Sequence, residues 1–161
     1  MKMIGHILRA FFISPEFLIS LAGLTLCWWR PTWLLAVSEQ IAQRSDVLNY
    51  AWLLPAGLLG YDAKVARDIL FPAADKETLL QGWQRYGELK SGIVVALVYG
   101  LIFAGAGIVA MLFDWKTPDA YQSATLISAV VGALTVSVTL YFAEIKVVEL
   151  FREGLTQRGE E

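Results

Sequence analysis

The chain has 161 residues, of which 57% are hydrophobic and 17% charged. A soluble protein of this size could not bury so much apolar surface. Its formal net charge of −2 gives no electrostatic support to nucleic-acid binding. The single cysteine, Cys27, excludes an intrachain disulfide and a multi-cysteine metal site, and the single histidine, His6, excludes a paired-histidine site.

The first membrane span is predicted over residues 14–37. Ser14, Pro15 and Glu16 are typical of a helix start, because serine caps, proline suits the first helical position and a carboxylate favours the positive end of the helix dipole. A coupling carboxylate inside the membrane is the alternative role for Glu16. The apolar run that ends at Trp29 would be about 22 Å long as a helix, which is shorter than a ~30 Å hydrocarbon core. We therefore expect the helix to continue through a proline kink to the end of that range.

The sequence CWWRPTWLL at residues 27–35 is predicted to lie at the far membrane face. Arg30 stands among Trp28, Trp29 and Trp33, and both residue types are common at membrane interfaces. We interpret these four residues as interface anchors, with a tryptophan-rich ligand pocket as the alternative.

The second span is predicted at residues 47–61, VLNYAWLLPAGLLGY. It is short and contains Pro55, so a re-entrant segment is the alternative. Tyr50, Trp52 and Tyr61 lie near its ends and are residue types found at membrane interfaces.

Two uncharged stretches, residues 91–113 and 123–143, predict the third and fourth spans because each provides about 20 apolar residues. Small residues recur at helical spacing in both, and such a ladder lets helix backbones approach closely in lipid. We predict that this small-residue ladder packs helices and supports a homo-oligomer, with the facing helix in the same chain or in another. Its members are Gly92, Ala96, Gly100, Ala104, Ser128 and Gly132.

Hydroxyl side chains form a second stripe in the last span. Ser128, Thr135 and Thr139 share one side of the helix and could line a wet path between subunits. They could equally bond to carbonyls of their own helix and need no water. The last two spans carry no ionisable group, which makes packing the favoured interpretation.

Residues 62–90 predict a helical hairpin in the cytoplasm, where both the four-span and the three-span model place them. In its first arm Val65, Ala66 and Ile69 share one face, while Asp62 and its charged neighbours are expected to lie away from it. The last span is expected to continue as a helix over residues 144–157. These cytoplasmic helices could pack on one another along the lipid headgroups, or dock a cytoplasmic protein partner. The residues predicted for docking are Leu79, Leu80, Trp83, Arg85 and Tyr86.

Orientation follows from the basic residues. A four-span model with both termini in the cytoplasm places ten of the 13 Lys and Arg residues inside, and a three-span model gives the same division. We prefer four spans because the basic end of a first span usually stays inside. The expected location is the bacterial inner membrane.

No catalytic constellation, cofactor motif or metal-ligand cluster is visible, and no motif identifies a family. The sequence therefore predicts an all-α, non-enzymatic, oligomeric membrane protein that anchors, senses for or scaffolds a cytoplasmic partner. Bacterial antiviral defence is a hypothesis for its setting that no particular residue supports. The alternative is a pore or membrane-permeabilising effector lined by the hydroxyl stripe, and a membrane enzyme is a third class without a visible site.

Overall fold

A computed structural model describes residues 11, 14–44, 50–51, 53–72, 83, 86–112, 117 and 119–158, with side chains as far as Arg152. This part of the chain is all-helical, as predicted. Its main helices are α2 (Pro15–Trp29), α3 (Pro31–Ala42), α5 (Leu53–Leu70), α7 (Tyr86–Leu112) and α8 (Ala120–Arg158).

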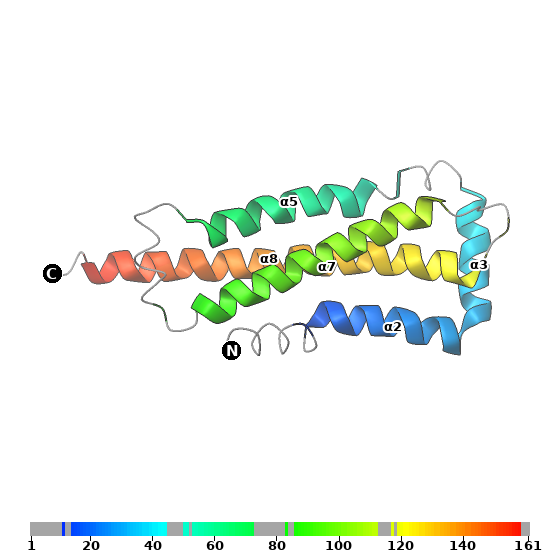
Figure 1. Cartoon of the computed structure of the whole chain (residues 1–161), viewed down its shortest axis with the longest axis horizontal. Helices are drawn as coiled ribbons and strands as arrows, with labels where there is room; N and C mark the ends of the chain where they lie inside the picture. Colours follow the sequence, from blue (N-terminus) through cyan, green and yellow to red (C-terminus); the bar gives the residue numbers. More distant parts are fainter. Residues whose placement is uncertain are drawn as a thin grey trace.

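The long helix α8 is the axis of the fold, since α2, α3, α5 and α7 all pack against it (Figure 1). Helices α2, α5 and α7 lie lengthwise along α8, whereas α3 crosses one end of the bundle (Figure 1). The main apolar core lies where α5, α7 and α8 meet, and it includes Val65, Ile69, Ile93, Tyr99, Phe103, Val136 and Leu140.

Among the described helices, α7 and α8 are long and apolar enough to cross a membrane. The 27 residues of α7 extend about 40 Å, and the 39 residues of α8 extend about 58 Å. A helix needs only about 30 Å to cross the hydrocarbon core, so α8 has a large excess of length. This excess agrees with the expected helical continuation past Ala143.

The predicted start of the first apolar helix is confirmed. Ser14 is the N-cap of α2, and its hydroxyl accepts a hydrogen bond of 3.1 Å from the backbone N–H of Phe17. Pro15 follows at the first helical position, where its missing N–H costs nothing.

The end of that helix differs from the prediction. Instead of continuing through a kink to residue 37, α2 ends at Trp29 and α3 turns across the end of the bundle (Figure 1). Arg30 lies between them with φ −135° and ψ 54°, outside the helical region. The physical reason is Pro31, whose ring disfavours helical geometry in the residue before it.

Helix α3 is held in its crossing position by a small second core. Leu34 is fully buried against Ala120 and Ala124 of α8. The Ser123 hydroxyl donates a hydrogen bond of 2.8 Å to the Leu34 carbonyl, so a polar contact joins the same two helices.

Helix α5 joins two segments that the sequence analysis separates. It runs unbroken from Leu53 to Leu70, through the end of the predicted second span and the first arm of the predicted hairpin. Val65, Ala66 and Ile69 are buried together, as their spacing predicts. Asp62 is buried with them, although it was expected with its charged neighbours to lie away from this face.

Candidate functional site

The small-residue ladder packs helices of the same chain. A Cβ atom added to Gly100 would lie 3.3 Å from Leu59 Cδ1 of α5 and 3.5 Å from Val136 Cγ1 of α8. Gly132 of α8 lies directly against the Phe103 ring of α7. Close approach of three helices therefore depends on these two glycines.

Other members of the ladder have different surroundings. Ser128 lies against Gly23 of α2, and Ala96 and Ala104 are buried. Gly92 has open space around it, since an added Cβ would meet no atom within 4 Å. A homo-oligomer built on this ladder stays a prediction.

Two of the three hydroxyls in the stripe, those of Thr135 and Thr139, are hydrogen-bonded within the protein. Thr135 donates to the Val131 carbonyl of its own helix at 2.9 Å, which is the alternative that the sequence analysis left open. Thr139 donates to Glu16 of α2. These contacts hold the two threonine hydroxyls within the protein.

The predicted docking residues are only partly covered by the described structure. Trp83 packs against the main core, and Tyr86 is buried, with its hydroxyl donating to the Ile69 carbonyl at 3.4 Å. The structure therefore places Tyr86 in the core and not on an open docking face. Leu79, Leu80 and Arg85 lie outside the described residues.

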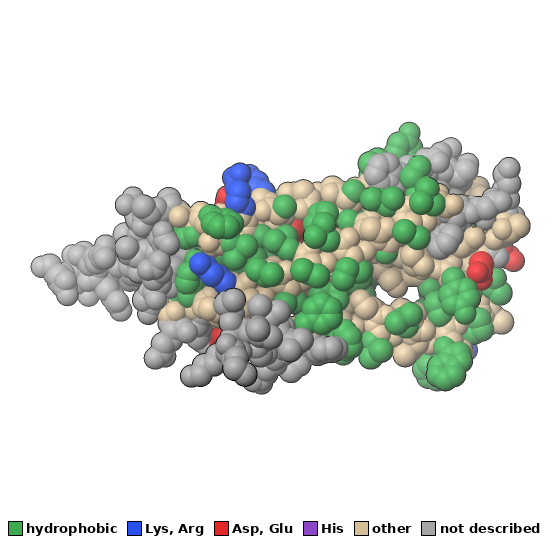
Figure 2. Space-filling view, viewed as in Figure 1, with side chains coloured by type: hydrophobic (Ala, Val, Ile, Leu, Met, Phe, Trp, Pro, Cys, Tyr) green, Lys and Arg blue, Asp and Glu red, His purple; other side chains and the backbone are tan. Residues whose placement is uncertain are grey.

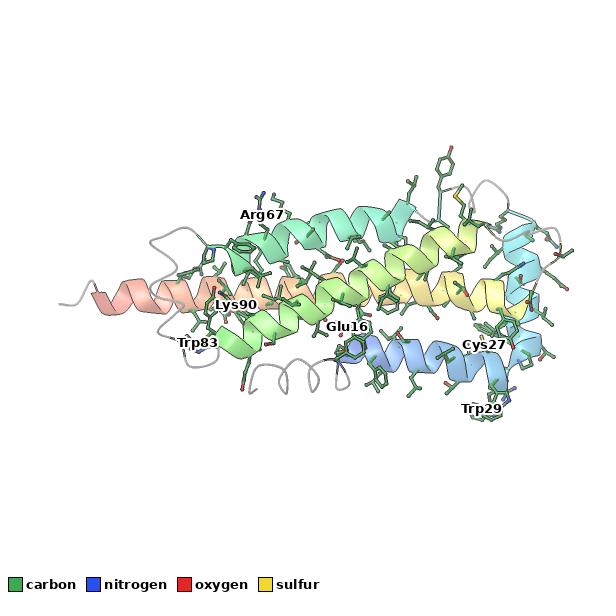
Figure 3. The ribbon with its side chains drawn as sticks, viewed as in Figure 1. Glu16, Cys27, Trp29, Arg67, Trp83 and Lys90 are labelled. Carbon is green, nitrogen blue, oxygen red and sulfur yellow. The ribbon has the colours of Figure 1, made fainter. Side chains whose placement is uncertain are left out.

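The predicted interface anchors gather at the corner between α2 and α3. Trp28, Trp29 and Trp33 are all exposed, and the Arg30 guanidinium lies 5.9 Å from the centroid of the Trp29 ring. Trp29 points away from the bundle, as Figure 3 shows. Such a cluster does not enclose a pocket of its own, and its exposure suits the anchor interpretation.

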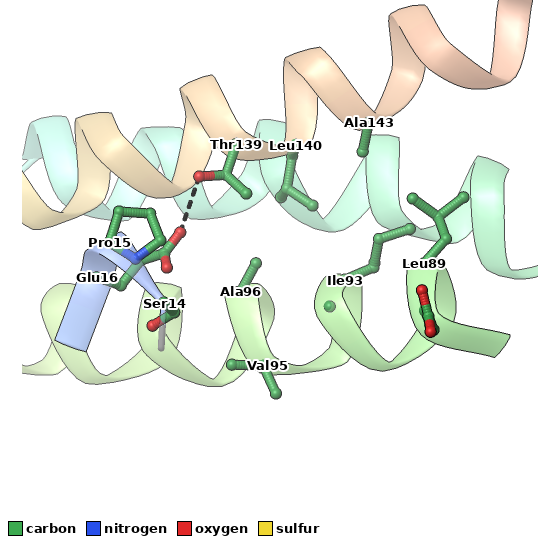
Figure 4. A pocket seen from close by; sticks show the side chains of 12 residues that line it. Ser14, Pro15, Glu16, Leu89, Ile93, Val95, Ala96, Thr139, Leu140 and Ala143 are labelled. Carbon is green, nitrogen blue, oxygen red and sulfur yellow. Dashed lines mark hydrogen bonds between the residues drawn. The ribbon is translucent and has the colours of Figure 1, made fainter. Parts of the chain in front are cut away.

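Glu16 is buried and contacts another helix, which a carboxylate that only favours the start of its own helix does not require. Its side chain is only 1% exposed, and Oε1 accepts a hydrogen bond of 2.9 Å from the Thr139 hydroxyl of α8 (Figure 4). Within the described part of the chain, no Lys or Arg forms an ion pair with it. The sequence shows a carboxylate at the edge of an apolar run, but not that α8 lies over it.

A cavity of about 250 Å³ opens beside Glu16, between α2, α7 and α8. Leu89, Ile93 and Ala96 line it from α7, and Leu140 and Ala143 line it from α8 (Figure 4). The cavity thus combines apolar walls with one deeply buried carboxylate. This combination makes the cavity a candidate ligand site.

A second buried carboxylate belongs to Asp62 of α5, which is also 1% exposed. The Ser137 hydroxyl of α8 faces it, but neither Asp62 Oδ1 nor Ser137 Oγ completes a hydrogen bond in the described structure. No described cavity includes Asp62, so it has less to offer a ligand than Glu16. Among the described residues, no group of three His, Cys, Asp or Glu side chains could hold a metal ion.

Comparison of the chain with protein-family models, with curated proteins and with solved structures found no match.

Proposed function

We propose that the protein is a non-enzymatic integral membrane protein that anchors or scaffolds a partner at its cytoplasmic end. The observation that carries this proposal is the division of the bundle into an apolar, outward-facing middle and a charged end that α8 overruns. Four spans, a homo-oligomer and an inner-membrane location belong to the same proposal.

Many large apolar side chains are exposed on the bundle, and hydrophobic patches are spread over the face shown in Figure 2. On α7 and α8 they include Val94, Val98, Leu101, Ile102, Ile108, Val131, Leu134, Val138 and Phe142. On a soluble monomer so much exposed apolar surface would favour aggregation, whereas a bilayer would accommodate it. The exposed apolar surface therefore supports insertion of the bundle into a membrane.

The described cations are distributed unevenly between the two ends. Arg30 and Arg44 flank α3 at one end, whereas the other half of the bundle carries Lys64, Arg67, Lys90, Lys146 and Arg152. Arg67 and Lys90 are among these in Figure 3. The positive-inside rule assigns the half with more cations to the cytoplasm.

Topology reporters test the orientation. Because of this charge asymmetry, we expect reporters fused after Arg9, inserted at Ala74 and fused at Glu161 all to report the cytoplasm. A reporter after Arg44 should report the opposite side and serves as the control. An external signal from Arg9 alone would favour three spans, and an external signal from Ala74 would overturn the orientation.

A photo-crosslinking pair tests the docking end. Val148 and Val138 are both on α8 and are 47% and 52% exposed, but only Val148 lies past the predicted span. With a photoreactive residue at each position in living cells, we expect a discrete protein adduct from position 148 and lipid adducts from position 138. The adducts are separated by gel electrophoresis and identified by mass spectrometry.

The outcome at the two positions is decisive for the anchor proposal. Equal adducts at both, or none at position 148, would contradict a docking end. An adduct of two copies of the chain at position 138 would instead support a homo-oligomer. The pore alternative has weaker support, because the Thr135 hydroxyl already bonds to its own helix.

A further inference from the structure

We infer that the cavity beside Glu16 binds a small lipophilic amine, whose ammonium group contacts Glu16 and whose apolar chain lies between α7 and α8. This ligand site is independent of the docking end proposed above. The proposal is based on the burial of Glu16, on the residues that line the cavity and on the size of the cavity.

Among the described residues, one side chain donates a hydrogen bond to the Glu16 carboxylate. An ionised carboxylate has about four acceptor sites, and here Thr139 provides one donor to Oε1. A buried carboxylate without a cation is costly, because the low-dielectric interior replaces water. A ligand ammonium would bring both a positive charge and three N–H donors, so it complements what the described residues leave open.

The shape and chemistry of the cavity also fit such a ligand. Its volume is about 250 Å³, and a dry cavity of roughly 150 Å³ holds a benzene molecule. By proportion, the space suits about ten heavy atoms, which is close to an eight-carbon amine. Leu89, Gly92 and Ala143 are half-buried lining residues and would contact the carbon chain.

The same features disfavour other ligand classes. A fatty acid would place a second carboxylate against Glu16, and Glu88 also lines the cavity. A hard metal cation prefers six or more oxygen ligands, whereas the walls here are mainly aliphatic. A neutral alcohol would fill the space but would bring no positive charge to the Glu16 side chain.

The experiment compares three probes of equal chain length, n-octylammonium, 1-octanol and octanoate. Binding to the purified full chain is measured by calorimetry in detergent, with empty micelles subtracted to remove partitioning. We expect octylammonium to bind about ten- to a hundredfold more tightly than octanol, because hydrogen bonds to charged groups are the stronger ones. Octanoate should not bind.

Glu16→Gln tests the role of the charge. It keeps the shape of the side chain and should remove the preference for octylammonium while leaving octanol binding unchanged. Equal binding of octanol and octylammonium by the natural protein, or an undiminished preference in Glu16→Gln, would overturn the proposal and indicate an alkyl or lipid chain in the cavity.

A glycine pair tests the location and does not depend on how Glu16→Gln folds. Gly92 lines the cavity and Gly105 does not, and at both positions an added Cβ would meet no atom within 4 Å. Gly92→Leu should fill the cavity and abolish octylammonium binding, whereas Gly105→Leu should bind as the natural protein does. Unchanged binding by Gly92→Leu, or equal losses in both variants, would exclude this cavity as the site.

Discussion

Gly132→Ala is expected to destabilise the bundle by about 1–3 kcal/mol, the usual cost of overpacking a core. The added methyl group would overlap the ring of Phe103, which is buried between helices. That ring stacks on Tyr99 with 6.1 Å between centroids, and Tyr99 stacks in turn on Phe11 at 4.7 Å. Because these rings support one another, Phe103 cannot move aside alone. Unfolding of the purified protein by a denaturing detergent measures the loss, and it is followed by near-ultraviolet circular dichroism, which reports the packing of aromatic side chains.

Gly105→Ala is the matched control, since it makes the same change in a helix where nothing lies within 4 Å of the new methyl group. In lipid or detergent the helices remain helical after they separate, so the helix propensity of alanine affects the folded and unfolded states almost equally. The stability of the control variant should therefore change by no more than about 0.5 kcal/mol. Phe103→Leu should partly rescue Gly132→Ala. The loss of stability in the double variant should then be smaller than the sum of the losses in the two single variants. Equal stability of the two alanine variants would mean that α7 and α8 do not approach closely at Gly132.

Local rules explain which parts of the fold could be predicted from the sequence. The cap at Ser14 and the first-position proline depend on neighbours within one helical turn, and both are confirmed. The buried face of Val65, Ala66 and Ile69 follows from helical spacing alone. Such features need no knowledge of which other helix lies opposite.

The differences arise where tertiary contacts decide. A proline can bend a helix or end it, and which of these happens at Pro31 depends on the space available to α3. The contact of Leu34 with α8 favours the observed arrangement, in which α2 ends and α3 crosses one end of the bundle. Glu16 and Asp62 are buried because α2 and α5 pack against α8, whose residues are far away in the sequence. No periodicity in the chain reports these helix pairs, so the cavity beside Glu16 could not be located from the sequence.

Leu140→Ala is the second substitution for which we expect a large effect, a loss of about 2 kcal/mol or more in bundle stability. Leu140 is 0% exposed and belongs to the main core, so shortening it leaves a void between α7 and α8. A bilayer is as apolar as leucine, and the loss therefore comes from missing packing contacts more than from hydration. This places the expected value near the lower end of the range for buried leucines.

Leu134→Ala is the control on the same helix, because Leu134 is 46% exposed and faces outward. Its loss should stay within about 0.5 kcal/mol if that face contacts lipid or detergent. Both variants are measured by the same detergent-unfolding assay. A large loss from Leu134→Ala would indicate that this face is covered by a second copy of the chain, because only a protein surface would leave a void there. A loss from Leu140→Ala no greater than that of the control would contradict the position of α8 as the central helix of the bundle.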